Sequence, residues 1–281
     1  MPATTYANWF SYTTDFISEN RELYRAIRTT RWVFLNRGLR FVGDGALDDR
    51  KIYGWLSGAA AEFVIRASHL ERRVQVYNRR LDRWEEESLG DLARTVPSAD
   101  SCSWQVAFSH AGRTRLATIK VGWLELRLPE SHQPLWAVVA QEYDATEQAT
   151  RTLVLLTNVA VWEEATARAV YEDWRLRGKI EHGYRFCQEQ GLDVEDMRVR
   201  TLERLRRLFV LVLLAMQFVW HVMQRWPPVA VRWLRWLGGK LGLGIDRDGP
   251  YLLLRGLHAV WQTVAALSHL GVCPFPHEAF R

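Results

Sequence analysis

Residues 39–67 constrain the fold more than any other stretch, because two apolar runs flank a segment with helical spacing. Residues 39–42 are apolar and run into Gly43-Asp44-Gly45, a pattern typical of a buried strand followed by a turn. Residues 48–58 have the apolar spacing of a helix, and residues 62–67 are a run of β-prone side chains. A strand, a helix and a second strand in this order favour a crossover unit, so we expect two parallel strands here.

The segments on either side complete the architecture. Residues 19–35 have helical spacing, and Gly38 marks their end. Short β-prone runs separated by Gly, Pro, Asn and Ser follow at residues 74–77, 104–108, 116–121, 124–128, 135–140 and 152–157. Helical spacing then predicts helices at residues 163–177, 178–190, 200–224, 229–237 and 252–270. We therefore expect an α/β fold, interrupted by an antiparallel β-rich insert and followed by a helical C-terminal region.

Composition limits the partners and the compartment. The net charge of +5 and the sequence pI of about 9.3 are a mild bias toward polyanions. The three widely spaced cysteines match neither a disulfide framework nor a zinc pattern, which favours a reducing compartment, the cytoplasm. No secretory signal is visible. The longest apolar run, residues 208–216, is too short for a bilayer, so we expect a buried helix there and no membrane partner.

One acidic residue, Glu181, lies in the middle of a stripe of very different side chains. Trp174 and Arg177 precede it by seven and four residues, and Arg185 and Gln188 follow it by four and seven. Such offsets place side chains on one helix face. Two alternatives remain open at this point: a solvated ion-pair ladder, or an acidic site surrounded by groups suited to phosphate.

A second acidic residue, Asp44, is expected where a buried strand ends, and ligand sites of open α/β sheets lie beyond such ends. An Asp there and a Glu on a neighbouring helix can share divalent metal ions through hard oxygen ligands. Two such ions clamp the attacking and leaving oxygens of a phosphoryl transfer. The alternative for Asp44 is a turn residue that caps Gly45. We expect the neighbouring Asp48 and Asp49 to be helix caps rather than ligands.

Two stretches of the chain resemble a known family. The sequence FVGDGALDDRKIYGWLSGAAAEFVIRA resembles the second-aspartate region of DDE-type insertion-sequence transposases, and YEDWRLRGKIEHGYRFCQEQGLDVEDMRVRTLERLRRLF resembles their third-acid region. The chain is similar to the "IS-four" group, which carries a Tyr-x2-Arg-x3-Glu-x6-Lys signature. Arg177 and Glu181 agree with that signature, whereas Trp174 replaces its Tyr and Gln188 its Lys. The resemblance covers roughly residues 39–224.

The resemblance implies a ribonuclease-H-like core and metal-dependent cutting and joining of transposon-end DNA. Asp44 and Glu181 would be the catalytic residues and the ligands of Mg²⁺ (or Mn²⁺). Trp174, Arg177, Arg185 and Gln188 would contact DNA. The partners would be double-stranded DNA, both transposon ends and target, and a second copy of the chain on paired ends.

The family also implies a first aspartate on an earlier strand, and Asp15, only 29 residues before Asp44, is a poor match for it. We therefore expect a core that is incomplete at the N-terminus. The expected segments are a partial core at residues 1–70, a strand insertion at 71–150, a return to the core with the Glu helix at 151–225, and a helical extension at 226–281. A non-catalytic DNA-binding protein and a helical interaction protein remain the alternatives.

Overall fold

The computed structural model describes residues 16–35, 37–96, 101–110, 113–130, 133–144, 146–185, 201–239 and 250–271. At residues 109, 110, 113, 114, 179–185 and 202 this description covers the backbone alone. The chain divides into two compact units. One comprises residues 5–180, and the other comprises residues 181–281 together with residues 1–4. The first unit contains the sheet, and each unit is described by itself.

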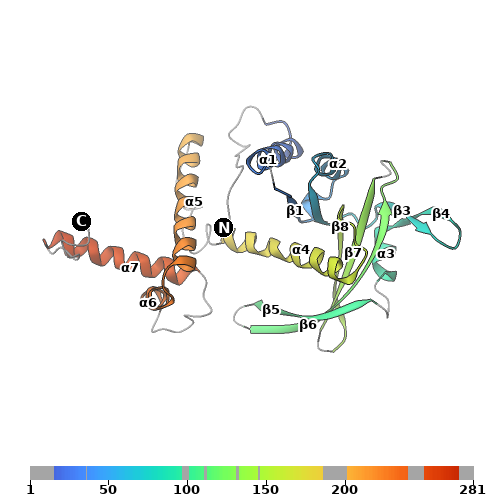
Figure 1. Cartoon of the computed structure of the whole chain (residues 1–281). Helices are drawn as coiled ribbons and strands as arrows, with labels where there is room; N and C mark the ends of the chain where they lie inside the picture. Colours follow the sequence, from blue (N-terminus) through green and yellow to red (C-terminus); the bar gives the residue numbers. More distant parts are fainter. Residues whose placement is uncertain are drawn as a thin grey trace. The chain divides into compact units, whose positions relative to one another are not determined.

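All described strands of the first unit belong to one sheet (Figure 1). They are β1 (Arg40–Gly43), β2 (Glu62–Arg66), β3 (Arg73–Asn78), β4 (Arg83–Ser88), β5 (Cys102–His110), β6 (Arg113–Arg127), β7 (Pro134–Tyr143) and β8 (Ala149–Thr157). The order across the sheet is β1-β2-β8-β7-β6-β3-β4, and β5 pairs with β6. Strands β1 and β2 are parallel, whereas the other pairs are antiparallel. The strands between β2 and β8 in sequence therefore extend the sheet that β1 and β2 begin.

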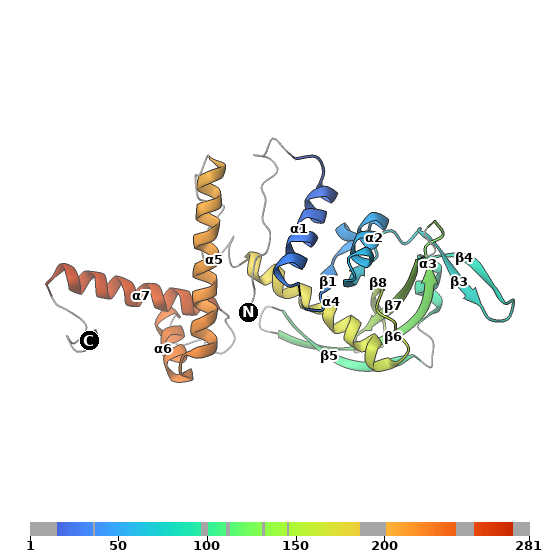
Figure 2. The same ribbon diagram turned by 45° about the horizontal axis from the view of Figure 1, so that its top comes forward.

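Helices cover both faces of this sheet, as Figure 2 shows for α1, α2 and α4. Helices α1 (Glu19–Val33), α2 (Arg50–Gly58) and α3 (Leu89–Thr95) contribute to one apolar cluster. Helix α4 (Glu164–Arg185) contributes to the cluster on the other face. Along β7 the side chains alternate between the clusters: Ala137 lies in the first, whereas Trp136 and Val138 lie in the second. The period of two in β-strands explains this division.

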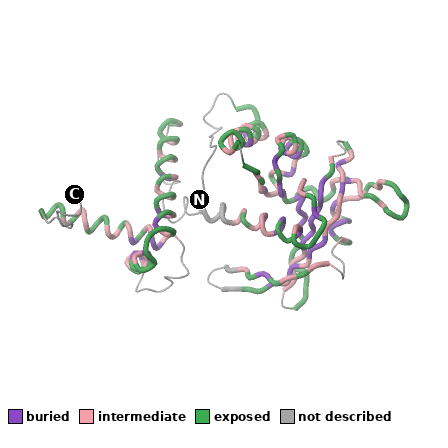
Figure 3. The backbone as a smooth tube through the Cα atoms, in the orientation of Figure 1, coloured by how far each residue is buried: buried purple, intermediate pink, exposed green. Residues whose placement is uncertain are grey.

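The buried residues concentrate in the sheet, as Figure 3 shows in purple. Helix α4 closes its face of the sheet with Ala167, Val170, Tyr171 and Trp174, all buried. Their offsets of three, four and seven residues form one stripe of the helix. Arg177 is not part of this stripe and lies beside the core, whereas Trp174, an expected DNA contact, is buried in it.

Most elements expected from the sequence are confirmed, including the parallel pair of β1 and β2. Three differences stand out. Residues 116–121 and 124–128 form one strand, β6, and the two helices expected at residues 163–190 are one helix, α4, as far as residue 185. Strand β4 and helix α3 were not predicted. The sequence of β4, RWEEES, has no apolar run, and its pairing with β3 supplies the order that its composition does not.

The second unit contains α5 (Leu202–Arg225), α6 (Pro228–Gly238) and α7 (Pro250–His269). Helices α6 and α7 approach so closely that a Cβ atom at Gly238 would overlap the carbonyl oxygen of Leu252. Val222, Leu234 and Leu253 are buried in the cluster that these helices share.

The expectation that residues 208–216 form a buried helix is wrong. In α5 the side chains of Val210, Leu211, Leu214 and Phe218 are each more than half exposed. The apolar residues cover two sides of the helix, and only one side packs in the unit. By length and composition alone, Glu203–Arg225 is the one described helix that could cross a membrane, and core helices of soluble proteins meet the same criteria.

Candidate active site at the end of the first strand

Asp44 lies directly after β1, at the carboxyl end of the parallel pair. It is the N-cap of a short 3₁₀ helix, Gly45–Leu47, and its Oδ1 accepts a hydrogen bond of 3.0 Å from the amide of Ala46. The capping alternative is thus confirmed, but the cap uses one carboxylate oxygen only. The side chain is 45% exposed, and its Oδ2 lies 3.4 Å from Nη1 of Arg177. One oxygen is therefore fixed by the turn, and the other faces a cation from α4.

Arg177 is held by an aromatic ring as well as by Asp44. Its Cζ lies 5.6 Å from the ring centroid of Trp174, and Cζ of Arg151, on β8, lies 5.4 Å from the same centroid. Trp174 is buried, with only 8% of the residue exposed. A guanidinium over a desolvated ring is attracted to it, and this contact restricts its position. Trp174 therefore affects the site indirectly, by holding the guanidinium of Arg177.

A second ion pair fastens α4 along β1. Asp173, one turn before Arg177, pairs with Arg40 at the start of β1, and Arg40 also pairs with Glu62 of β2 at 2.6 Å. Four residues span about 13 Å in a strand and about 6 Å in a helix, and the long Arg side chains bridge the difference. The order of charges is opposite in the two segments. Basic Arg40 pairs with Asp173, and acidic Asp44, four residues later, pairs with Arg177. This arrangement fixes the direction of α4 as it passes Asp44.

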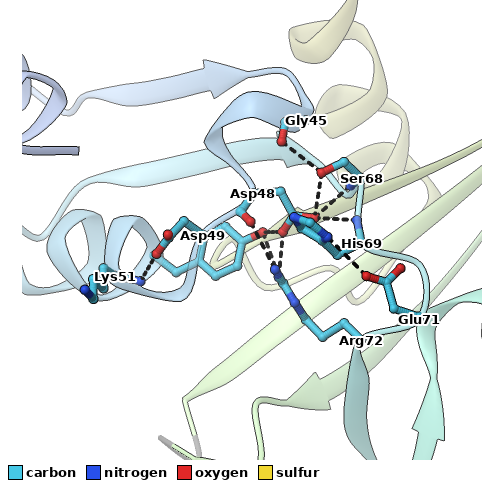
Figure 4. A network of polar contacts seen from close by, with 9 residues as sticks. Gly45, Asp48, Asp49, Lys51, Ser68, His69, Glu71 and Arg72 are labelled. Carbon is cyan, nitrogen blue, oxygen red and sulfur yellow. Dashed lines mark hydrogen bonds and ion pairs between the residues drawn. The ribbon is translucent and has the colours of Figure 1, made fainter. Parts of the chain in front are cut away.

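Behind the Asp44 turn lies a buried polar network, drawn in Figure 4. The carboxylate of Asp48, whose side chain is fully buried, accepts hydrogen bonds from the amides of Ser68 and His69 at 2.7 and 2.9 Å. The Arg72 guanidinium donates to Asp48 Oδ1 at 2.5 Å, and the hydroxyl of Tyr53 donates to the same oxygen. The expectation that Asp48 caps the start of the following helix is therefore wrong. The cap of α2 is Asp49, which accepts from the amide of Lys51.

The network determines the charge of Asp48. Burial on its own raises the pKa of this carboxyl. The hydrogen bonds from Tyr53, His69 and Ser68 and the charge of Arg72 outweigh burial, and the pKa of Asp48 lies below its ordinary value. The pKa of the Tyr53 hydroxyl is raised by burial and by the neighbouring carboxylate. Asp48 is thus a permanent anion near neutral pH, and Arg72 is its counterion.

The remaining predicted site residues lie at or beyond the end of the described part of α4. Glu181 and Arg185 belong to the helix, but their side chains lie outside the described residues, as does Gln188 altogether. Among the side chains that are described, no three His, Cys, Asp or Glu groups gather where they could hold a metal ion. Of the two predicted ligands, Asp44 is the one whose side chain is described, and its half-exposed carboxylate offers the hard oxygen that Mg²⁺ prefers.

Sequence reasoning missed the Asp48 network because its partners are separated in sequence. Ser68, His69 and Arg72 follow Asp48 by 20 to 24 residues, across α2 and β2. Two adjacent aspartates before a helix resemble a pair of caps whichever of them turns inward. The one available signal was the position of Asp48 in the connection between a buried strand and its helix, and this signal does not name a partner.

Fold and site together define a class: an α/β protein with a carboxylate beyond a parallel strand and a basic helix passing it. Ligand sites of open sheets lie at that edge. A family model described as "Transposase DDE domain" matches residues 9–218 of the chain. The protein therefore belongs to the DDE transposase domain family. A comparison with curated proteins gives no match.

Proposed function

We propose that this protein is an IS-four-like transposase that cleaves transposon-end DNA and joins it to a target by metal-dependent phosphoryl transfer. The observation that carries the proposal is the contact between Arg177 and Asp44. It brings the helix of the acidic signature to the strand end of the second-aspartate region, in a chain of the DDE transposase family. The parallel β1 and β2, joined by α2, support a ribonuclease-H-like core.

In this proposal the carboxylates of Asp44 and Glu181 hold Mg²⁺ or Mn²⁺. Glu181 follows Arg177 by one helical turn, which is the spacing that stacks side chains on one face. The bound ions would supply charge stabilisation for the attacking and leaving oxygens. The family's first aspartate is not assigned among the described residues, so the proposal names two ligands of three.

Arg177 has a double role in the proposal. A guanidinium carries five N–H donors in a planar fork, and the contact with Asp44 uses one nitrogen at 3.4 Å. In the proposal the same guanidinium also contacts a DNA phosphate beside the metal, a contact that Arg makes in two-pronged form. In the proposal Trp174 orients the Arg177 guanidinium through their cation–π contact. Arg185 and Gln188 make further contacts along the DNA. Two DNA ends require two active sites, and the proposal therefore includes a homodimer.

The test is strand cleavage of double-stranded DNA that carries the element's own terminal repeats, with Mg²⁺ or Mn²⁺ and the full chain. Cleavage should require the divalent ion and should be lost in Glu181→Gln and in Asp44→Asn, which keep the shape of each side chain. Salt-dependent DNA binding without cleavage would favour the alternative, a non-catalytic DNA-binding protein. Absence of DNA affinity at low salt would contradict both the transposase and the DNA-binding protein.

A further inference from the structure

We infer that Ser68 and Asp48 are positioning residues that aim the carboxylate of Asp44 at its metal. This inference rests on the proposed function, in which Asp44 is a ligand. It concerns side chains that contact neither DNA nor the ion, and that act through the backbone of the turn between β1 and α2. The argument begins with how that turn is held.

The turn from Asp44 to Asp48 is fastened at both ends. At its start, the hydroxyl of Ser68 donates to the carbonyl oxygen of Gly45 at 2.9 Å, next to Asp44. At its end, Asp48 accepts from the Ser68 amide, and Arg72 donates to the backbone carbonyl of Asp48 at 3.0 Å. Ser68 is therefore bonded to both ends of the turn (Figure 4).

The turn also closes upon itself. The amide of Leu47 donates to the carbonyl of Asp44 at 3.1 Å, and the amide of Asp48 donates to Gly45 at 3.2 Å. A Cβ atom at Gly45 would lie 2.7 Å from Cβ of Ser68, so the backbone rests directly on that side chain. With one oxygen of Asp44 bonded to Ala46, the orientation of its carboxylate follows the orientation of the turn.

Asp48 itself is excluded as a ligand by its saturation. Its Oδ1 accepts from Tyr53 and Arg72, and its Oδ2 accepts from the amides of Ser68 and His69, with the Ser68 hydroxyl at 3.3 Å. An ionised carboxylate offers about four acceptor positions, all of which are taken here. A buried and fully bonded anion can hold a backbone segment in place. Outer-shell partners of metal ligands hold those ligands in the same way.

The decisive experiment measures Mn²⁺ binding to the full chain by titration calorimetry, without DNA and without turnover. Ser68→Ala removes the hydroxyl contacts with Gly45 and with Asp48 Oδ2 but leaves the bond from the Ser68 amide to Asp48. It should weaken Mn²⁺ binding by about tenfold or more, the size of outer-shell effects on metal affinity. The Ala46 amide should exchange its hydrogen faster, because its acceptor Asp44 is no longer held. Thr157→Val is the matched control, since it also removes a hydroxyl bonded to a backbone carbonyl, that of Phe63, away from Asp44.

The outcomes separate the inference from the proposed function. If Asp44→Asn weakens Mn²⁺ binding while Ser68→Ala leaves both affinity and exchange unchanged, the positioning role is wrong and the metal role of Asp44 stands. If Asp44→Asn itself leaves Mn²⁺ affinity unchanged, the proposed metal site is wrong. If Thr157→Val lowers Mn²⁺ affinity as much as Ser68→Ala does, the effect is a general loss of stability and the positioning role is overturned.

Discussion

The guanidinium of Arg177 lies 3.4 Å from the carboxylate of Asp44, although 133 positions separate the two residues in sequence. One residue directly follows a strand, and the other lies on a helix that returns to the sheet after seven more strands. An acid at a sheet edge attracts any cation that can reach it. Here it faces a base from the helix that also carries Glu181, and this contact places Arg177 at the carboxyl end of β1.

Arg177→Gln tests whether this guanidinium serves DNA as well as Asp44. Removing one phosphate contact should weaken DNA binding similarly for all sequences and reduce the slope of log affinity against log salt by about one. Fluorescence anisotropy at several salt concentrations measures both. Arg175→Gln is the control, because Arg175 lies on the same helix but pairs with Glu172. An equal loss of slope in both variants would contradict a specific role for Arg177.

The pair of Arg40 and Asp173 should contribute modestly to stability. Both side chains are about one-third exposed, so solvent screens the attraction. A double-mutant cycle with Arg40→Ala and Asp173→Ala, read by urea unfolding, should give a coupling of about 0.2–1 kcal/mol. A coupling of zero would mean that apolar packing alone, through Tyr171 and Trp174, sets the position of α4.

Asp48→Ala should be far more destabilising, because it leaves Arg72 and two amides without their acceptor in a buried place. Breaking a buried pair in this way costs about 3–5 kcal/mol. Urea unfolding measures the loss, with Asp91→Ala as the control, since Asp91 is an exposed acid that also pairs with an arginine. Similar losses in the two variants would show that burial adds nothing to the Asp48 pair.

The same carboxyl should give the protein a distinct acid sensitivity. The folded pKa of Asp48 is lowered, so its contribution to stability is complete above the unfolded pKa and disappears as the pH falls through the folded value. The unfolded value is about 3.9. The difference in unfolding free energy between the protein and its Asp48→Asn variant should thus be constant near neutral pH and shrink below about pH 4. A difference that shrinks already at pH 6 would contradict the lowered pKa.

The sequence was sufficient where neighbours along the chain decide the structure. The apolar runs around Asp44 predicted β1, α2 and β2 and their parallel pairing. Helical offsets placed Trp174 on one stripe with Arg177 and Glu181, and they did not predict that Trp174 is buried against the sheet. It was insufficient where the deciding partner is distant. Ser68 and Arg72 turn Asp48 inward, whereas Asp49, chemically identical, remains a cap. No local pattern separates the two aspartates, because the difference lies in residues beyond the next strand.

Gly45→Ala tests the close approach of the Asp44 turn to Ser68. The added Cβ would lie 2.7 Å from Cβ of Ser68, and neither atom lies at the end of a flexible side chain. The turn must therefore move away, which stretches the bond from Ser68 to Gly45, and overpacking of this kind costs about 1–3 kcal/mol. Gly54→Ala, in α2 with open space around its Cβ, is the control and should stabilise by about 0.4–1 kcal/mol. Thermal unfolding compares the two, and a Gly45→Ala protein as stable as the Gly54→Ala protein would show that the turn is free to shift.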